Sequence, residues 1–158
     1  MHTILAVFSM TRYSTELLVR VIAKAKEATD PHVTVLYVTE KTDLEKLKER
    51  TGDQGFLGTI PVDRFMHSVL GEHEKLKQER LLEIGRRLDE EHISYKVHER
   101  QGKYSDSVIR EVEQTLYDSV FLPKPQRSCI ERLFLGSEVM RVAEYSRKTR
   151  KSEINIVE

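Results

Sequence analysis

The apolar residues of the chain follow two spacings, and each spacing predicts a type of element. Nearly continuous apolar runs rich in β-branched and aromatic residues are typical of strands buried on both faces of a parallel sheet. Three runs have this form: Thr3–Phe8, Val33–Val38 and Ser119–Leu122. Two weaker runs alternate apolar and polar residues as half-buried strands do, namely Ser94–His98, which we place nearer a sheet edge, and Ile154–Val157. The chain therefore predicts five strands.

Apolar residues at helical spacing fill the intervals between these strands. We expect a first helix capped by Ser14, and a long helix that begins at Pro61 and has Gly71 as the candidate point for a kink. We also expect a helix capped by Ser105 and a last helix from Gly136 to about Lys148. The inward side of the helix after Ser105 is predicted to carry Val108, Ile109, Val112 and Leu116.

Strands that alternate with helices predict an α/β fold. We expect a five-stranded parallel open sheet with helices on both faces, formed by residues 1–158 as a single domain. Ligands of such sheets bind outside the carboxyl ends of the strands. Any site is therefore expected among residues 9–12, 38–40, 100–104 and 123–128.

Residues 39–71 are the irregular part of the chain. Asp43–Arg50 is a short charged helix candidate, and three glycines follow it around Phe56 and Leu57. We expect these apolar residues to fold back onto the domain. The alternatives are a lid or a surface that docks a protein partner.

Composition narrows the classes of partner and compartment. The 158 residues hold 26 Lys and Arg against 26 Asp and Glu, so no net charge attracts nucleic acid or an anionic membrane. No apolar stretch approaches the length of a membrane span, and the first residues lack the pattern of a signal peptide. Cys129 is the single cysteine, which fits a reducing compartment. We expect a cytoplasmic protein without nucleic-acid or membrane partners.

Motifs for common catalytic chemistry are missing from the sequence. The first predicted strand is followed by SMTRYS, which has no glycine-rich phosphate loop, and no nucleophile elbow is found. The six histidines lack metal-ligand spacing, and Cys129 has no neighbouring histidine to activate it. No residue set offers a nucleophile, a base and an orienting group. The expectation is a protein that is not an enzyme and holds no metal.

The segment from Asp118 to Met140 is the most informative part of the chain. Its strand, loop and Gly-Ser helix start resemble the universal stress protein family, whose loop follows the pattern G-x2-G-x9-G-S/T. Here that pattern falls on Pro123, Gln126, Gly136 and Ser137 with its spacing intact. The runs ILAVF, VTVLYV and LFLGSEVMRVAEYS are also similar to that family. The resemblance covers nearly the whole chain and implies the Rossmann-like universal stress protein fold.

Departures from the family pattern argue against tight ATP binding. ATP-binding members are expected to carry an aspartate at the end of the first strand, where this chain has Ser9. Pro123 and Pro125 cannot donate backbone N–H groups to phosphates. The contacts that the resemblance leaves for a nucleotide or anion are Val38, Gly136 and Ser137. We therefore expect no cofactor, with ATP or AMP as the alternative.

These observations leave three interpretations of function. The first is a dimeric stress-response or regulatory binding protein that does not bind ATP tightly. The second is a nucleotide-binding switch or slow ATPase with an altered phosphate loop, and the third is a protein-docking module that uses residues 39–71. The last strand, residues 152–157, alternates like an open edge, and the resemblance implies that it pairs with its copy in a homodimer.

Overall fold

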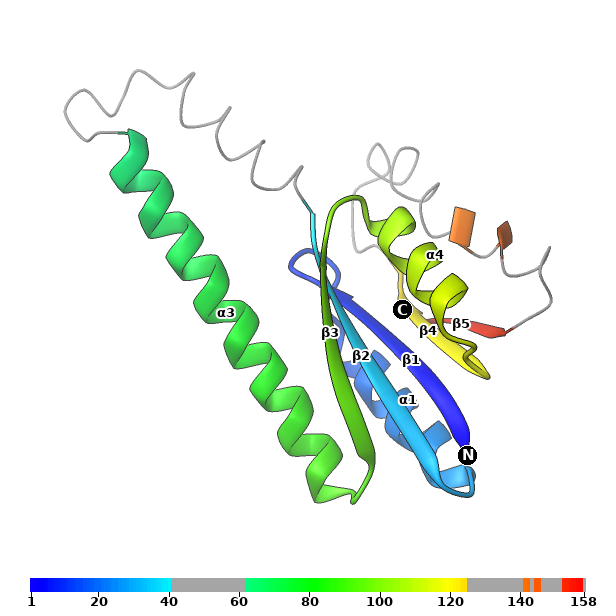
Figure 1. Cartoon of the computed structure of the whole chain (residues 1–158). Coiled ribbons are helices and arrows are strands. Elements are labelled where there is room, and N and C mark those ends of the chain that lie inside the picture. The colour runs from blue at the N-terminus through cyan, green and yellow to red at the C-terminus, as the bar shows by residue number, and fades with distance from the viewer. Residues whose placement is uncertain (41–61, 125–140, 143, 146–151, 158) are drawn as a thin grey trace.

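The computed structural model describes residues 1–40, 62–124, 141–142, 144–145 and 152–157 (Figure 1). Its centre is a five-stranded sheet in the order β3-β2-β1-β4-β5, in which every neighbouring pair is parallel. The strands are β1 (His2–Ser9), β2 (Pro31–Thr39), β3 (Ser94–Gln101), β4 (Ser119–Pro123) and β5 (Glu153–Val157). The predicted parallel sheet is confirmed, with β3 and β5 at its two edges.

The helices lie on both faces of this sheet, as predicted. They are α1 (Thr15–Glu27), α3 (Val62–Glu90) and α4 (Tyr104–Gln114). Successive side chains of a strand point to opposite faces of the sheet, so β1 contributes residues to two hydrophobic cores, one on each face. Ile4, Ala6 and Phe8 pack with residues of α1 and α3, whereas Leu5 and Val7 pack with residues of α4 and with Val142.

Helix α1 begins where the sequence predicts. Ser14 has extended backbone angles, and its hydroxyl accepts the N–H of Leu17 at 3.2 Å. Five apolar residues of the helix are buried on the side that faces the sheet: Leu17, Leu18, Val21, Ile22 and Ala25. The cap and the apolar stripe together fix the first crossover.

Helix α3 is a single element that continues through Gly71, and only some of the apolar side chains that the structure describes in it are buried. Ile84 and Leu88, near its end, are buried, whereas Leu70 and Leu76 are exposed. Figure 1 shows the cause, since α3 runs obliquely and stands progressively farther from the sheet toward its first residues. The predicted irregular segment also ends earlier than residue 71, because Val62 already begins this helix. Residues 41–61 lie outside the described residues.

Two predictions about α4 are wrong. Ser105 is not the cap, because the helix starts one residue earlier after Lys103, and Ser105 is buried in the first turn. Leu116 does not face inward and is 69% exposed, because the helix ends at Gln114 and helical periodicity no longer applies beyond it. Val108 and Val112 are buried as predicted.

Of the last predicted helix, the described residues 141–142 and 144–145 are helical. Gly136 and Ser137 lie outside the described residues. Among the helices that the structure describes, none has the length and apolar character needed to span a bilayer.

Candidate functional site

The topology places a candidate ligand-binding edge between β1 and β4. The chain runs outward from β1 to β2 and β3 and then returns to add β4 on the other side of β1. Ligands of open α/β sheets bind where the strand order reverses in this way. The described residues at this edge are 9–12, 38–40, 101–104 and 123–124.

The connection from β1 to α1 is a turn whose backbone groups are largely paired. Ser9 Oγ accepts the N–H of Arg12 at 3.1 Å, and Ser9 N–H donates to the Arg12 carbonyl at 3.2 Å. From α3, Arg80 donates to the Met10 carbonyl at 2.9 Å, and its guanidinium lies 4.5 Å from the centroid of the Tyr13 ring. Ser9, where ATP-binding members of the resembling family are expected to carry an aspartate, is therefore a buried residue at the end of β1 that is bonded to the turn.

The charged side chain that this turn contributes is Arg12, which sequence reasoning did not single out. Arg12 is only 4% exposed, and its guanidinium carbon lies 4.0 Å from the ring centroid of the buried Tyr104 at the start of α4. Such a contact contributes roughly 0.5–2 kcal/mol, whereas burying an unpaired ion costs several kcal/mol. In the part of the chain that the structure describes, no acceptor meets Nη1 or Nη2. The ring alone does not compensate the buried cation.

The end of β4 offers little to a phosphate. Pro123 has no N–H, and the N–H of Lys124 donates to the Val157 carbonyl at 2.6 Å, so it belongs to the sheet. Val38, the third residue proposed from the resemblance, is fully buried in β2 and packs in the core on the α4 side. The structure therefore brings Val38 to the predicted edge, while Gly136 and Ser137 lie beyond the described residues.

Glu40 closes the same edge at the end of β2. It is 9% exposed, and its Oε2 accepts a hydrogen bond from Thr11 Oγ1 at 3.4 Å. The contact links the β1 turn to the end of β2.

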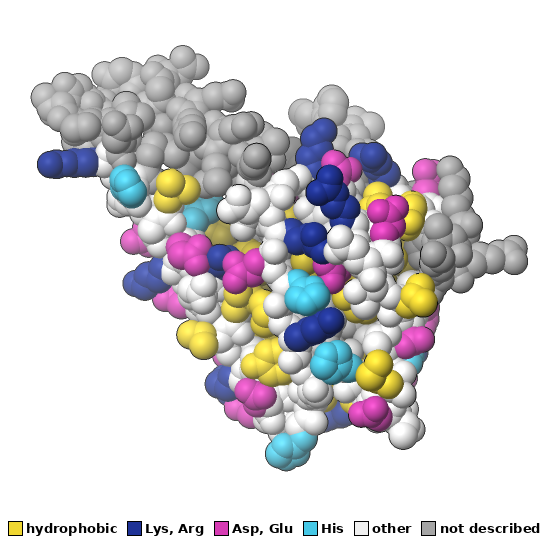
Figure 2. All heavy atoms as spheres, viewed as in Figure 1, with side chains coloured by type: hydrophobic (Ala, Val, Ile, Leu, Met, Phe, Trp, Pro, Cys, Tyr) yellow, Lys and Arg dark blue, Asp and Glu magenta, His cyan; other side chains and the backbone are white. Residues whose placement is uncertain are grey.

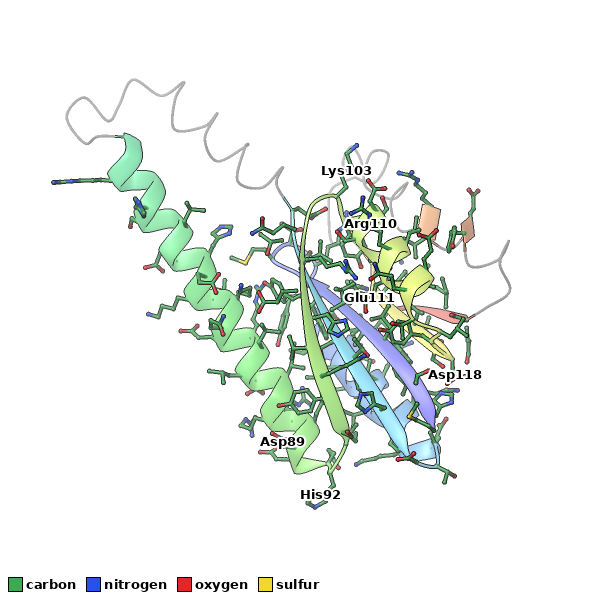
Figure 3. All side chains as sticks on the ribbon, viewed as in Figure 1. Asp89, His92, Lys103, Arg110, Glu111 and Asp118 are labelled. Carbon is green, nitrogen blue, oxygen red and sulfur yellow. The ribbon has the colours of Figure 1, made fainter. Side chains whose placement is uncertain are left out.

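A second buried polar cluster lies between β3 and α4, centred on Glu111 (Figure 3). The Glu111 side chain is 1% exposed. Arg100 donates to Oε2 through Nε and Nη2 at 2.9 and 2.8 Å, and Tyr117 donates to Oε1 at 2.9 Å. His98 Nδ1 lies 2.7 Å from Oε1. Each carboxylate oxygen thus has partners within the domain.

The titration of this cluster follows from its contacts. Burial alone raises the pKa of Glu111, but the hydrogen bonds from Arg100, His98 and Tyr117 outweigh it and hold that pKa below its ordinary value. Burial, together with the bond to Glu111, raises the pKa of Tyr117 to about 12. These directions describe an ionised carboxylate that is held by hydrogen-bond donors.

A cleft of about 630 Å³ lies between α3 and the ends of β1, β2 and β3. Its lining includes Met10, Tyr37 and Lys77. Lys77 Nζ is matched by two carboxylates, Glu74 at 2.9 Å and Glu99 at 2.6 Å. The cleft thus differs from the Arg12 position, because its cation is already paired. Across the described residues, no group of three or more His, Cys, Asp or Glu side chains is placed to hold a metal ion.

Comparison with known proteins agrees with this architecture. Residues 57–149, more than half of the chain, match the universal stress protein family. The chain belongs to that family. The resemblance drawn from the sequence is confirmed, and the end of β4, Arg12 and Glu111 can be considered as features of a universal stress protein domain.

Solved structures share the fold at low sequence identity. The hypothetical protein MJ0577 is 15% identical with a TM-score of 0.65, over 97% of this chain and 94% of that one. A universal stress family protein from Burkholderia pseudomallei is 9% identical with a TM-score of 0.59, over 98% and 94%. The hypothetical protein PH0823 is 20% identical with a TM-score of 0.55, over 99% and 94%. No curated protein matches the chain significantly.

Proposed function

We propose that this universal stress protein is a regulatory binding protein that does not hold ATP through a backbone phosphate loop. The observation that carries the proposal is the end of β4. Pro123 has no N–H, and the N–H of Lys124 is bonded to the Val157 carbonyl. Two missing donors at about 1.5–3 kcal/mol each correspond to a loss of more than roughly a hundredfold in affinity.

The β1 side of the edge supports the same proposal. The amide and hydroxyl of Ser9 are both bonded to Arg12, and Arg80 occupies the Met10 carbonyl. The charged group contributed by this turn is the cation of Arg12 rather than a carboxylate. A nucleotide would therefore meet few uncommitted backbone groups in the β1 turn or at the start of the loop after β4.

Binding rather than catalysis fits the titratable groups of the described residues. The cluster that most resembles a catalytic set contains His98, Glu111 and Tyr117. Its carboxylate is buried, ionised and held by Arg100, and the pKa of the Tyr117 hydroxyl is raised to about 12. Neither the Glu111 carboxylate nor the Tyr117 hydroxyl suits proton transfer near neutral pH.

Nucleotide-dependent thermal unfolding tests the proposal. A ligand at a hundred times its Kd stabilises a protein by about 2.7 kcal/mol, or roughly 5–10 °C for a domain of this size. We expect millimolar ATP, ADP or AMP to raise the Tm by less than about 1 °C. A saturable rise of several degrees in the unmodified protein, with no rise at the same concentration of inorganic phosphate, would instead support the nucleotide switch.

A matched variant separates the loop from the rest of the edge. The double substitution Pro123→Gly and Gln126→Gly restores the two early glycines of the family pattern and returns a backbone donor at position 123. We expect it to bind ATP more tightly than the unmodified chain in the same assay. Equal behaviour would show that the end of β4 is not what limits nucleotide binding.

We further propose that the protein acts as a homodimer joined through residues 152–157. The support is the position of β5 at the edge of the sheet, with Ile156 40% exposed. An open edge of apolar residues pairs readily with a second strand. The third interpretation, docking through residues 39–71, remains a prediction from the sequence, because residues 41–61 lie outside the described residues.

A further inference from the structure

The strand order reverses between β1 and β4, and we call this edge of strand ends the switch-point edge. Its Arg12 guanidinium is buried and lacks hydrogen-bond acceptors at two of its nitrogens. It is the single buried arginine among the described residues, at 4% exposure. Within that same part of the chain, Nη1 and Nη2 have no hydrogen-bond acceptor. An arginine cannot shed its charge as a buried lysine can, so the cation persists and requires a counter-charge.

Three other arginines of the described residues have hydrogen-bond acceptors or ion-pair partners for their guanidinium groups. Arg100 is held by Glu111, and Arg80 donates to the Met10 carbonyl. Exposed Arg86 is paired with Glu83 and Glu90 on its own helix. Arg12 is more buried than any of these three, yet the aromatic face of Tyr104 is the contact that the structure gives it. The arrangement leaves the planar N–H fork available for a partner that lies in its plane.

The surroundings favour an anion. Arg100, Lys103 and Arg110 line a hollow of about 340 Å³ at the end of β3 and the start of α4, and Lys103 directly precedes Tyr104 in the chain. Figure 3 shows Lys103 and Arg110 projecting at this end of α4, and Figure 2 shows Lys and Arg side chains gathered on the same part of the surface. Glu99 and Asp106 share that hollow, so the surface attracts anions without being uniformly basic.

We propose that Arg12 is the receptor for an anionic small molecule, bound at the switch-point edge through a carboxylate or phosphate group that its guanidinium holds with two parallel hydrogen bonds. Tyr104 supports the cation from one face. This inference rests on the proposed function and extends it, because side-chain charge would supply the recognition that the backbone at the end of β4 does not.

Titration with inorganic phosphate and with succinate, at ionic strength held constant with sodium chloride, tests the inference. The readouts are calorimetric binding and thermal unfolding of the full chain. The variant Arg12→Met keeps a long side chain over Tyr104 but removes the fork. The control Arg20→Met makes the same change of charge at an exposed position of α1, away from the hollow. We expect saturable binding in the unmodified protein, at least tenfold weaker binding in Arg12→Met, and unchanged binding in Arg20→Met.

Each result has a defined meaning. Saturation by phosphate alone supports a phosphorylated ligand, and saturation by succinate alone supports a carboxylate. The inference is overturned by no saturable binding of either anion, by a Tm that rises without saturating, or by equal binding in Arg12→Met. If Arg12→Met does not fold, Arg12→Lys takes its place, because it keeps the charge and loses the fork. Binding by Arg12→Lys equal to that of the unmodified protein then overturns the inference.

A neutral probe separates this inference from the proposed function. Adenosine carries the base and ribose of ATP without its charge. ATP binding that is tighter than adenosine binding and persists in Arg12→Met would contradict the proposed function, because another group then holds the phosphates; the anion results alone decide the Arg12 inference. Phosphate binding that is lost in Arg12→Met, without adenosine binding, supports both.

Discussion

Arg12 and Glu111 are the two least exposed charged side chains among the described residues, at 4% and 1%. Glu111 has Arg100, His98 and Tyr117 around its carboxylate, whereas Arg12 rests on an aromatic ring. A buried charge with complete partners stabilises the position of its neighbours, whereas for Arg12, which lacks them, we propose an external anion. The two residues thus carry different roles at similar burial.

Replacing Glu111 by glutamine is expected to destabilise the domain by about 2–4 kcal/mol at neutral pH. The substitution removes the negative charge that Arg100 and His98 share and turns one acceptor oxygen into a donor. The partly exposed Arg100 regains some water, which keeps the cost toward the lower end. Urea unfolding of the two proteins at pH 7 measures the difference.

The unmodified protein and Glu111→Gln are also expected to differ in how their stability depends on pH. The pKa of Glu111 is lower in the folded protein than its ordinary value near 4.5, so the unfolded state binds more protons there. Its contribution to stability is full above the unfolded pKa and is lost as the pH falls through the folded one. The difference between the unmodified protein and Glu111→Gln should therefore shrink below about pH 4.5. A difference that stays constant down to pH 3 would contradict this account, because Asp118 and other carboxylates are common to both proteins.

Helix α3 shows how one element can serve two environments. Its end packs against the sheet through Ile84 and Leu88, while its first half stands away from the sheet and exposes Leu70 and Leu76. Its two glycines differ accordingly. A methyl group at Gly71 would meet nothing within 4 Å, whereas one at Gly85 would lie 2.5 Å from the hydroxyl oxygen of Tyr95 on β3.

Alanine substitutions at the two glycines should therefore have different effects. Gly71→Ala is expected to stabilise the protein by about 0.5–1 kcal/mol, because alanine favours the helix and nothing obstructs it. Gly85→Ala gains the same propensity but must displace Tyr95, so we expect no net gain or a loss. Chemical denaturation compares the two. Adding Tyr95→Phe to Gly85→Ala should recover part of the loss, and equal stabilisation at both glycines would contradict the close approach.

The sequence correctly predicted the features that depend on residues within a single strand or helix. β1, β2 and β4 are nearly continuous apolar runs because both faces of a central parallel strand are buried, and Ser14 caps its helix locally. The sequence did not predict the features that depend on contacts between residues far apart in the chain. The exposure of Leu76 depends on where α3 leaves the sheet, and the stacking of Arg12 on Tyr104 joins residues far apart in the chain.

The candidate site was predicted in part. The carboxyl ends of the strands follow from the fold class, and Pro123 was recognised from its missing N–H. The bond from Lys124 to Val157 was not predictable, since it depends on how β5 extends beside β4. Glu111 did leave a signal, because it lies at helical spacing between Val108 and Val112 on the buried side of α4. An acid in an apolar stripe indicates a buried partner.

The two edges of the sheet differ in how they are protected against pairing with another strand. β3 carries exposed Lys96 and Glu99, and charged side chains discourage pairing with another strand. In β5, the residues after Glu153 are uncharged, from Ile154 to Val157. A second copy of the chain is therefore expected to add at β5, and the particle in solution should have twice the 18.5 kDa mass of one chain.

The hydrogen-bond register of β5 identifies which residue to change in order to test the proposed pairing of two chains at this edge. Glu153 donates to the Asp118 carbonyl and Val157 accepts from Lys124, so residues 153, 155 and 157 face β4. The N–H groups of Ile154 and Ile156 consequently point to the open edge. Ile156→Pro removes one outward donor without taking a bond from the β4 ladder, whereas Ile156→Ala removes the same side chain and keeps the donor.

We expect Ile156→Pro to weaken dimerisation at least tenfold and Ile156→Ala to remain dimeric at micromolar concentration, as measured by sedimentation or light scattering. The tenfold loss corresponds to about 1.4 kcal/mol, the size of one backbone hydrogen bond. Both variants lose the packing of the isoleucine side chain, so a difference between them isolates the backbone edge. A monomeric unmodified protein contradicts pairing at β5, as does a dimer that Ile156→Pro leaves intact. Equal weakening in the two variants would instead assign the contact to the side chain.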